Sequence, residues 1–384
     1  MSGLLVFIVL VFIGVAVWQL TKIFHLTQVG ASESNEIAND KDNNINGYLM
    51  FGFLAFIYLI TIFCVVKYGD LPLLNNSASE HGVDVDNLMW ISLVLIFFVQ
   101  TLTQALLHYF AFKYRGKEGR EVVYFADNNK LEFIWTIIPV ITLAGLILYG
   151  LYTWNNIMYY DQEEEVIYVE LYAKQFGWEA RYAGEDNTLG KANVRYIEGI
   201  NTLGVDLADP AAQDDKVVNE LHLPKGKKVV FKIRSQDVLH SAYMPHFRAQ
   251  MNCVPGMVTQ FVFTPTVTTD EMRQREEIIF KVDRINKIRA KKSAQLVAEG
   301  KEALDPYTFD YLLLCNKICG KAHYNMQMKI VVESPEDFKK WLSEKPTLSK
   351  QWAEANAPAE TPAPAAESAE TVVDTTKVLA QVIK

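Results

Sequence analysis

The chain has 384 residues, half of them hydrophobic, and a formal net charge of −8. This composition is too apolar for an ordinary soluble enzyme and too polar for a pure membrane bundle, so we expect part membrane and part globular structure. The acidic balance gives no support to nucleic-acid binding, which requires a basic face.

Uncharged runs long enough to cross a bilayer, which takes about 20 helical residues, occupy the N-terminal part of the chain. They are Gly3 to Leu20, Gly47 to Val66, Leu88 to Phe112 and Phe133 to Trp154. Basic residues gather between the third and fourth runs, so this loop is expected in the cytoplasm and the segment after Trp154 outside. The first run must then stay as a spanning helix rather than a cleaved signal peptide, with the segment from Thr21 to Asn46 in the cytoplasm.

The third and fourth runs carry polar residues of interest. Gln100, Thr103, Gln104 and His108 share one helical face, which we expect to pack on a partner subunit, and His108 is assigned no metal. Glu132 opens the fourth run, where a carboxylate suits either a proton pathway or a helix N-terminus.

Alternating apolar residues after position 165 predict strands joined in an all-β Greek-key sandwich. The strand-like segments are 166–182, 227–236, 257–266, 277–283 and 328–334. An insertion near 284–306 is expected to be helical from Arg284 to Lys301 because it is rich in Lys, Arg and Ala. The segment 346–384 is rich in Ala, Pro, Glu and Thr and is predicted to be a disordered tail.

The segment CNKICGKAHYNM places two cysteines, a histidine and a methionine within one short stretch, at Cys315, Cys319, His323 and Met326. A single electron-transfer copper needs one thiolate, so two thiolates favour a pair of bridged coppers. His240 is the candidate for the missing imidazole. A zinc site or a disulfide between the two cysteines is the alternative, although neither uses the methionine.

Three motifs together resemble subunit II of the haem-copper respiratory oxidases, in the cytochrome c oxidase branch. They are DVLHS around His240, VPG at Val254 to Gly256, and Cys-x-x-x-Cys-Gly-x-x-His-x-x-Met from Cys315. The resemblance covers roughly Leu88 to Trp341 and sharpens the β-domain to a cupredoxin. It implies a dinuclear copper centre, CuA, bridged by the two cysteines. His240 and Met326 would complete one copper, and His323 and the Lys317 carbonyl would complete the other.

The resemblance also implies roles for other positions. Glu132 matches the family's glutamate at a proton-channel entrance, while Phe176 and Trp178 match the electron-entry aromatics, where the family's first Trp is here Phe. That replacement puts the usual docking of a soluble cytochrome c in doubt and favours a fixed donor. Lys317 replaces a family Glu that helps to hold magnesium at the interface with subunit I, so the magnesium site is also in doubt.

The sequence therefore predicts membrane helical hairpins, about four spanning helices, followed by a cupredoxin-like domain. We divide it into two extra N-terminal helices (1–66), a subunit II hairpin (67–160), an extracytoplasmic copper domain (161–345) and the tail. The predicted function is subunit II of a proton-translocating cytochrome c oxidase in a bacterial inner membrane. Expected partners are subunit I with its haems and CuB, subunit III, and a c-type cytochrome donor, membrane-bound or in a supercomplex. A copper-insertion protein, or a quinol-oxidase subunit without copper, is the rival interpretation.

Overall fold

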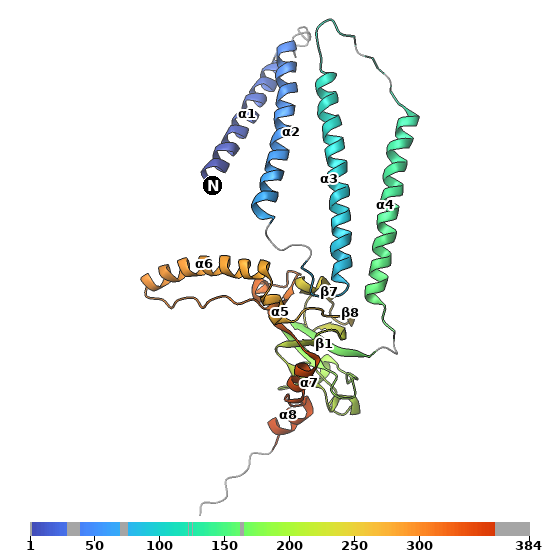
Figure 1. Cartoon of the computed structure of the whole chain (residues 1–384), viewed down its shortest axis with the longest axis vertical. Coiled ribbons are helices and arrows are strands. Elements are labelled where there is room, and N and C mark those ends of the chain that lie inside the picture. Colours follow the sequence, from blue (N-terminus) through green and yellow to red (C-terminus); the bar gives the residue numbers. More distant parts are fainter. Residues whose placement is uncertain are drawn as a thin grey trace, which may run out of the picture.

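The computed structural model of the chain describes residues 2–28, 39–69, 76–121, 123–124, 126–161 and 165–357. Long helices stand on one side of a β-domain (Figure 1): α1 (Ser2–Gln28), α2 (Asp40–Tyr68), α3 (Gly82–Lys113) and α4 (Asn129–Met158). Among the described residues, α2, α3 and α4 are long and apolar enough to cross a membrane. The described apolar stretch of α1 is the shorter Phe7–Ile23. Three of the predicted runs thus coincide with candidate spans, and the first lies within α1.

The beginning of α2 lies beside the end of α3. The Asn43 side chain donates to the Gly116 carbonyl over 3.2 Å, and the Arg115 guanidinium donates to the Asn44 side chain over 2.7 Å. Gly47 permits this approach, because a Cβ there would lie 2.8 Å from the Phe112 ring. The antiparallel pair places the beginning of α2 at the same end of the helices as the basic residues after α3.

The polar face of α3 has a partner within the chain itself. His108 is buried, and its Nδ1 lies 2.8 Å from the Gln104 carbonyl oxygen. Both residues line a groove with Asn46 and Leu49 of α2. At these two positions α2 occupies the place that we expected a partner subunit to take, whereas Thr103 is exposed.

The β-domain is a sandwich of two five-stranded sheets, ordered β3-β2-β1-β5-β8 and β4-β10-β9-β6-β7. The strands are β1 (Val166–Lys174), β2 (Gly177–Tyr182), β3 (Lys216–Val218), β4 (Leu221–Pro224), β5 (Lys228–Ser235), β6 (His240–Met244), β7 (Ala249–Cys253), β8 (Thr259–Phe263), β9 (Tyr311–Cys315) and β10 (Gln327–Glu333). Two neighbouring pairs, β1 with β5 and β4 with β10, are parallel, and the other pairs are antiparallel. This architecture confirms the predicted cupredoxin-like domain.

The core lies between the two sheets and is formed by side chains that point inward from alternate positions of the strands. Alternate residues of the central strands β1 and β5, among them Leu171, Phe231 and Ile233, are fully buried in one cluster with Leu223 and Leu313 of the facing sheet. The inward side chains hold the two sheets together. The strand ends that carry the candidate ligands are therefore attached to a packed scaffold.

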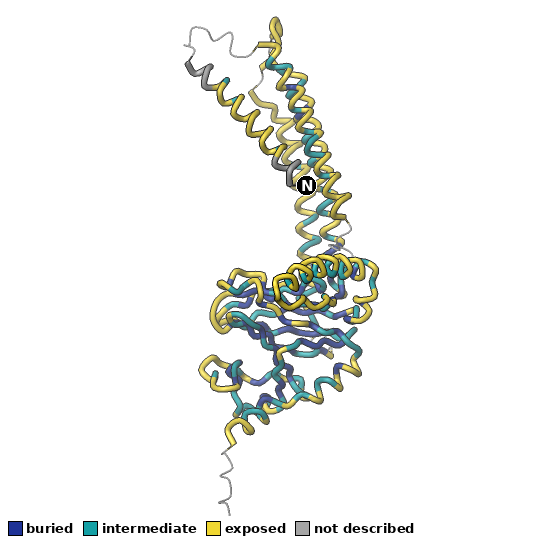
Figure 2. The backbone as a smooth tube through the Cα atoms, turned by 90° about the vertical axis from the view of Figure 1, so that its left-hand side faces the viewer, coloured by how far each residue is buried: buried dark blue, intermediate teal, exposed yellow. Residues whose placement is uncertain are grey.

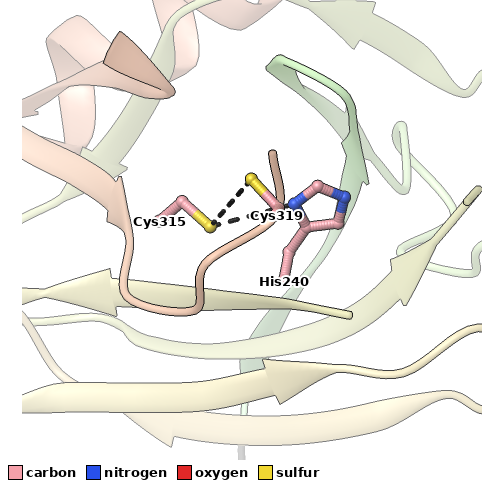
Figure 3. A group of neighbouring side chains, drawn as sticks. All are labelled: His240, Cys315 and Cys319. Carbon is pink, nitrogen blue, oxygen red and sulfur yellow. Dashed lines mark hydrogen bonds between the residues drawn. The ribbon is translucent and has the colours of Figure 1, made fainter. Parts of the chain in front are cut away.

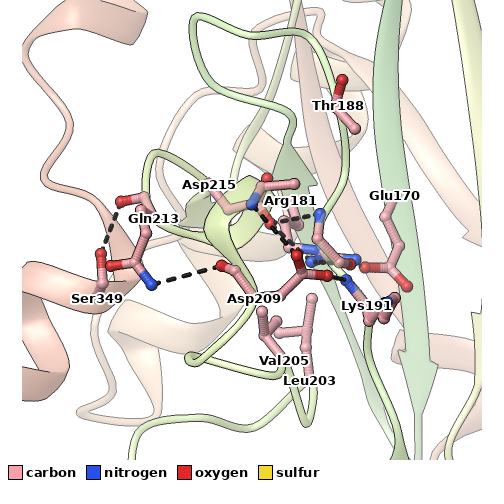
Figure 4. Close-up of polar contacts among 12 residues, drawn as sticks. Glu170, Arg181, Thr188, Lys191, Leu203, Val205, Asp209, Gln213, Asp215 and Ser349 are labelled. Atoms are coloured by element: carbon pink, nitrogen blue, oxygen red, sulfur yellow. Dashed lines mark hydrogen bonds and ion pairs between the residues drawn. The ribbon is translucent and has the colours of Figure 1, made fainter.

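A buried ion-pair network supports the sheet that contains β1, β2 and β5 (Figure 4). Arg181 donates to Glu170 at 2.5 Å and to Asp215 at 2.8 Å, and Arg234 also contacts Glu170. The Arg181 guanidinium further donates to the Gly190 carbonyl at 2.9 Å. The network ties β1, β2 and β5 to the long connection between β2 and β3.

One predicted strand is wrong. Residues 277–283 form part of the helix α6 (Glu276–Ala298), which follows the short helix α5 (Thr269–Arg273). Ile278, Val282 and Ile285 are spaced as one helical face, and the first two pack against the domain core. The helical insertion therefore begins and ends earlier than the predicted Arg284 to Lys301.

The predicted disordered tail is also wrong at its beginning. After α7 (Pro335–Ser343), residues Leu348–Ala355 form the helix α8, capped by the Thr347 side chain, which accepts from the Lys350 N–H at 3.3 Å. Leu348 is buried beside Tyr172 and Leu203, and its N–H donates to the Asp215 carbonyl at 2.8 Å. The remainder of the tail, after residue 357, lies outside the described residues.

The beginning of α3 and the residues just before it are fixed to the β-domain. Ala78 donates its N–H to the His246 carbonyl at 2.7 Å, and the Ser79 hydroxyl donates to the Phe247 carbonyl at 2.7 Å. Arg248 contacts the buried Asp86 of α3 at 2.7 Å. These contacts hold the domain against the end of α3.

Candidate metal centre

Three strands bring the candidate ligands together. His240 begins β6 and Cys315 ends β9, and these strands pair antiparallel so that Ala242 lies opposite Cys315. Between Cys315 and β10 the chain makes a loop, whose two ends are joined by the Cys315 N–H donating to the Met326 carbonyl at 3.1 Å. The loop thereby turns Cys319, His323 and Met326 back toward Cys315.

The two cysteine sulfurs lie 3.8 Å apart, and both cysteines are free thiols (Figure 3). A disulfide bond is about 2.05 Å long, so the disulfide alternative does not describe this pair. His240 Nδ1 lies 3.8 Å from Cys315 Sγ, whereas His323 Nδ1 lies 3.7 Å from Cys319 Sγ. Each sulfur therefore has an imidazole of its own.

Two weaker ligand candidates complete the group. The Met326 thioether lies 3.8 Å from Cys319 Sγ, and the Lys317 carbonyl oxygen lies 3.2 Å from Cys315 Sγ. The Lys317 side chain itself is exposed and takes no part. All six predicted donors are thus brought into one cluster, and the donor atoms of His240, Cys315 and Cys319 lie within 4.8 Å of one another.

The donor set fits copper better than zinc. Zinc sites take closed tetrahedral sets of Cys and His with no use for a thioether. Here Met326 is almost fully buried, with its sulfur directed at Cys319 rather than at an apolar neighbour alone. Soft thiolate and thioether donors combined with imidazoles are the set that copper selects.

Asp237 orients one of the imidazoles. Its carboxylate lies 2.8 Å from His240 Nε2, which leaves Nδ1 directed at the sulfurs. Burial opposes ionisation, but hydrogen bonds from His240 and from the N–H groups of Gln175 and Val238 keep the pKa of Asp237 below its usual value. A carboxylate behind a ligating histidine fixes its tautomer and raises its basicity.

Gln175 connects the two ligand segments. Its N–H donates to Asp237 at 2.7 Å, and its side-chain amide donates to the Cys319 carbonyl. Neither Gln175 nor Asp237 was among the site residues predicted from the sequence. For Asp237 a signal was present, since a carboxylate three residues before a candidate ligand can reach its ring.

Cys319 of the cluster and Cys253 beside it are both shielded from water. Burial raises the pKa of the Cys319 thiol to about 11, and the hydrogen bond and charge of Cys315 add to the rise. Metal binding would displace the thiol protons, because the thiolate is the ligand. Cys253 lies opposite His240 in the pairing of β6 and β7, where burial raises its pKa to about 12 and leaves it a neutral packing group.

Two protein-family models match segments of this chain. The model of the cytochrome c oxidase subunit II transmembrane domain matches residues 71–153, and that of the periplasmic domain matches residues 169–280. The alternative cytochrome c oxidase subunit 2 of Bradyrhizobium diazoefficiens is 32% identical over 267 residues, which cover 69% of this chain and 81% of that protein. The chain belongs to the cytochrome c oxidase subunit II family.

Other family members are more distant. The cytochrome c oxidase subunit 2 of Thermostichus vulcanus is 22% identical over 311 residues, covering 74% of this chain and 81% of that protein. The crystal structure of the periplasmic domain of subunit II from Bradyrhizobium japonicum is 19% identical, covers 46% of this chain and 91% of that one, and has a TM-score of 0.26. This chain is thus a membrane-anchored subunit of a haem-copper oxidase, and its β-domain lies on the outer side of the membrane.

The two family models leave residues 1–70, 154–168 and 281–384 unmatched. The second model ends at residue 280, within α6. The Cys315 to Met326 loop therefore lies beyond the matched segments, and its assignment depends on the geometry above.

Of the other predicted site residues, Trp178 and Phe176 lie next to the candidate ligands, whereas Glu132 lies far from them. Trp178 is buried, with its ring edge-on to the His240 ring at 6.4 Å between centroids. Phe176 is half-buried, and its ring lies 3.0 Å from where a Cβ would stand on Gly320 of the ligand loop. Glu132 is exposed in the first turn of α4, far along the helix from the β-domain.

Proposed function

We propose that this chain is the electron-entry subunit of a cytochrome c oxidase, active only within the assembled complex. The single observation that carries the proposal is the pair of free sulfurs 3.8 Å apart, each with its own imidazole. Two bridged coppers bound there would accept and release one electron at a time. We assign the electrons to a c-type cytochrome donor and to haem in subunit I, which reduces oxygen to water.

The protein side chains would hold the metal pair as follows. Cys315 and Cys319 would supply thiolates to both coppers, His240 and Met326 would hold one copper, and His323 and the Lys317 carbonyl would hold the other. The paired strands β6 and β9, the joined loop ends and the Asp237 hydrogen bond keep these donors in place. A rigid donor set suits electron transfer, because little has to move when the charge changes.

Electrons would enter beside the ligand loop. Ile318 and Tyr324, on either side of Cys319, are 87% and 89% exposed, and Phe176 and Trp178 lie next to the loop and to His240. Exposed apolar side chains over a redox centre suit a docking surface. We propose that a membrane-bound c-type cytochrome, or one fixed in a supercomplex, docks here, in line with the Phe at position 176.

The membrane part would serve the catalytic subunit. We assign Glu132, exposed at the cytoplasmic start of α4, to the entrance of a proton pathway in subunit I, with proton translocation as the consequence. Subunit III is a further expected neighbour, and a bacterial inner membrane is the expected location, with the β-domain in the periplasm. The exposed Lys317 side chain brings no carboxylate to a magnesium site at that interface.

Copper loading of the purified full chain in detergent tests the proposal. The expected result is a pair of coppers per chain and an electron paramagnetic resonance spectrum in which one unpaired electron is shared by both. A mononuclear spectrum from one labile copper would instead identify a copper carrier. A chain that folds but retains no copper would identify a structural subunit of the quinol-oxidase type.

A further inference from the structure

The helix α6 lies on the membrane-facing side of the β-domain. Figure 1 shows it crosswise to α3 and α4, at the level where these helices reach the domain, and extending beneath the ends of α1 and α2. Figure 2 shows the same helix, mostly exposed, at the top of the domain. Its position places it beside the headgroups of any bilayer that α3 and α4 cross.

One face of α6 is held by the chain that returns to β9. Asn286 exchanges hydrogen bonds with the main chain of Tyr307 at 2.7 Å and 3.1 Å. Arg289 donates to the Asp305 carbonyl at 2.8 Å, and the Ser293 hydroxyl accepts from the Leu304 N–H at 3.0 Å. In Figure 1 this returning segment runs along the side of α6 that faces away from the membrane helices.

The opposite face is an exposed basic stripe. Phe280, Arg284, Lys287 and Lys291 follow one another at i, i+4, i+7 and i+11, so they share a face, and all four are exposed. Lys287 is paired within the helix with Asp283 at 2.6 Å. Since the returning segment covers the other side, the stripe is directed toward the ends of the membrane helices.

The charge of α6 is opposite to that of the chain. The helix contains six basic residues, Lys281, Arg284, Lys287, Arg289, Lys291 and Lys292, against three acidic ones, Glu276, Glu277 and Asp283, whereas the whole chain has a net charge of −8. Basic side chains around an exposed aromatic are what an interfacial helix offers to an anionic membrane surface. Three of the six, Arg284, Lys287 and Lys291, lie with Phe280 on the exposed stripe, whereas Arg289 is bonded to the returning segment.

We infer that α6 is a membrane-surface helix whose stripe binds the headgroups of anionic phospholipids. Phe280 enters the boundary between headgroups and acyl chains, and the basic side chains contact the phosphates. The domain already rests on the end of α3 through the Asp86–Arg248 contact, so α6 gives it a second, lateral support. This inference is independent of copper binding.

Hydrogen–deuterium exchange of the full chain in lipid nanodiscs tests the inference. The amides of α6 are expected to exchange about tenfold more slowly with phosphatidylglycerol present than in phosphatidylcholine alone, because each basic residue near an anionic surface adds to binding. High salt should remove the difference, since screening weakens surface charges. Equal exchange in both lipids would overturn the inference.

A matched pair of variants separates this contact from a general charge effect. Arg284→Glu, Lys287→Glu and Lys291→Glu together should abolish the lipid-dependent protection. Lys339→Glu, Lys340→Glu and Lys350→Glu make the same charge change on exposed positions of α7 and α8, at the far end of the domain, and should preserve it. Exchange of the β1 and β5 amides checks that each variant is folded.

The assembled oxidase gives the remaining outcome. If α6 becomes protected only in the complex, and equally in both lipids, the stripe belongs to a partner subunit and the lipid assignment is wrong. Protection that follows lipid charge both in the isolated chain and in the complex supports it.

Discussion

The side-chain amide of Gln175 donates a hydrogen bond to the main-chain carbonyl of Cys319, although the two residues are 144 positions apart in the chain. The same residue donates its N–H to Asp237, which holds the His240 ring. One glutamine therefore connects both halves of the ligand set. Its removal should loosen their relative position without removing a ligand.

Gln175→Ala should lower copper affinity by about tenfold to 100-fold, the usual cost of losing an outer-shell partner of a metal site. Competition with a copper chelator, followed by electron paramagnetic resonance, measures this. Gln236→Ala is the control, because Gln236 is exposed nearby and its contact to Ala173 uses only its N–H. Equal copper affinity in the two variants would show that the Gln175 contact is dispensable.

Met326→Leu should raise the reduction potential of the copper pair and leave both metals bound. The buried thioether is a weak axial donor, and such a donor tunes the potential more than it holds the metal. A redox titration monitored by the optical spectrum measures the shift. Met328→Leu, a buried core change on the adjacent strand β10, should leave the potential unchanged, and loss of both coppers from Met326→Leu would contradict the expectation.

His246 should make the protein less stable in mild acid. Burial, with the nearby charges of Lys281 and Arg248, lowers its pKa from 6.5 to about 4, and its ring packs edge-on against Phe309 and Tyr311. Above pH 6.5 the ring is neutral in both states and makes no pH-dependent contribution. As the pH falls toward 4, only the unfolded chain takes up the proton, so stability is lost through that window.

Denaturation of the full chain in detergent at several pH values checks this. Between pH 7 and pH 5 the wild-type chain should lose up to about 2 kcal/mol more than His246→Gln, since each unit of pKa shift corresponds to about 1.4 kcal/mol. Parallel curves for the two proteins would exclude His246 as the cause.

Arg181→Met should be among the most destabilising single changes in the β-domain. It leaves the buried Asp215 without its guanidinium and Glu170 with Arg234 alone. Breaking a buried pair on one side costs about 3–5 kcal/mol. Arg273→Met removes the partly exposed contacts to Asp270 and Asp310 and a hydrogen bond to the Phe309 carbonyl, and it should cost less, about 1–2 kcal/mol. Similar denaturation midpoints for the two variants would count against the network.

Local patterns determined much of this protein. The apolar runs at α2, α3 and α4 and the alternation in β1 and β5 are readable because burial follows a period set by the backbone within each segment. The ligand group of Cys315, Cys319, His323 and Met326 is also readable from the sequence, because all four residues lie in one short segment. The same local logic failed at 277–283, where a short apolar segment suits both a strand and a helix, and at Leu348–Ala355, where burial against Tyr172 stabilises a helix that composition argued against.

Only the tertiary structure decided which distant groups meet. The approach of His240 to Cys315 depends on the register of β6 against β9, and the links through Gln175 and Asp237 depend on two sheets packing face to face. Likewise, α2 covers His108, and α6 turns its basic stripe toward the membrane helices, because of how separate elements pack. Such contacts are set by long-range packing free energy, which no short stretch of sequence contains.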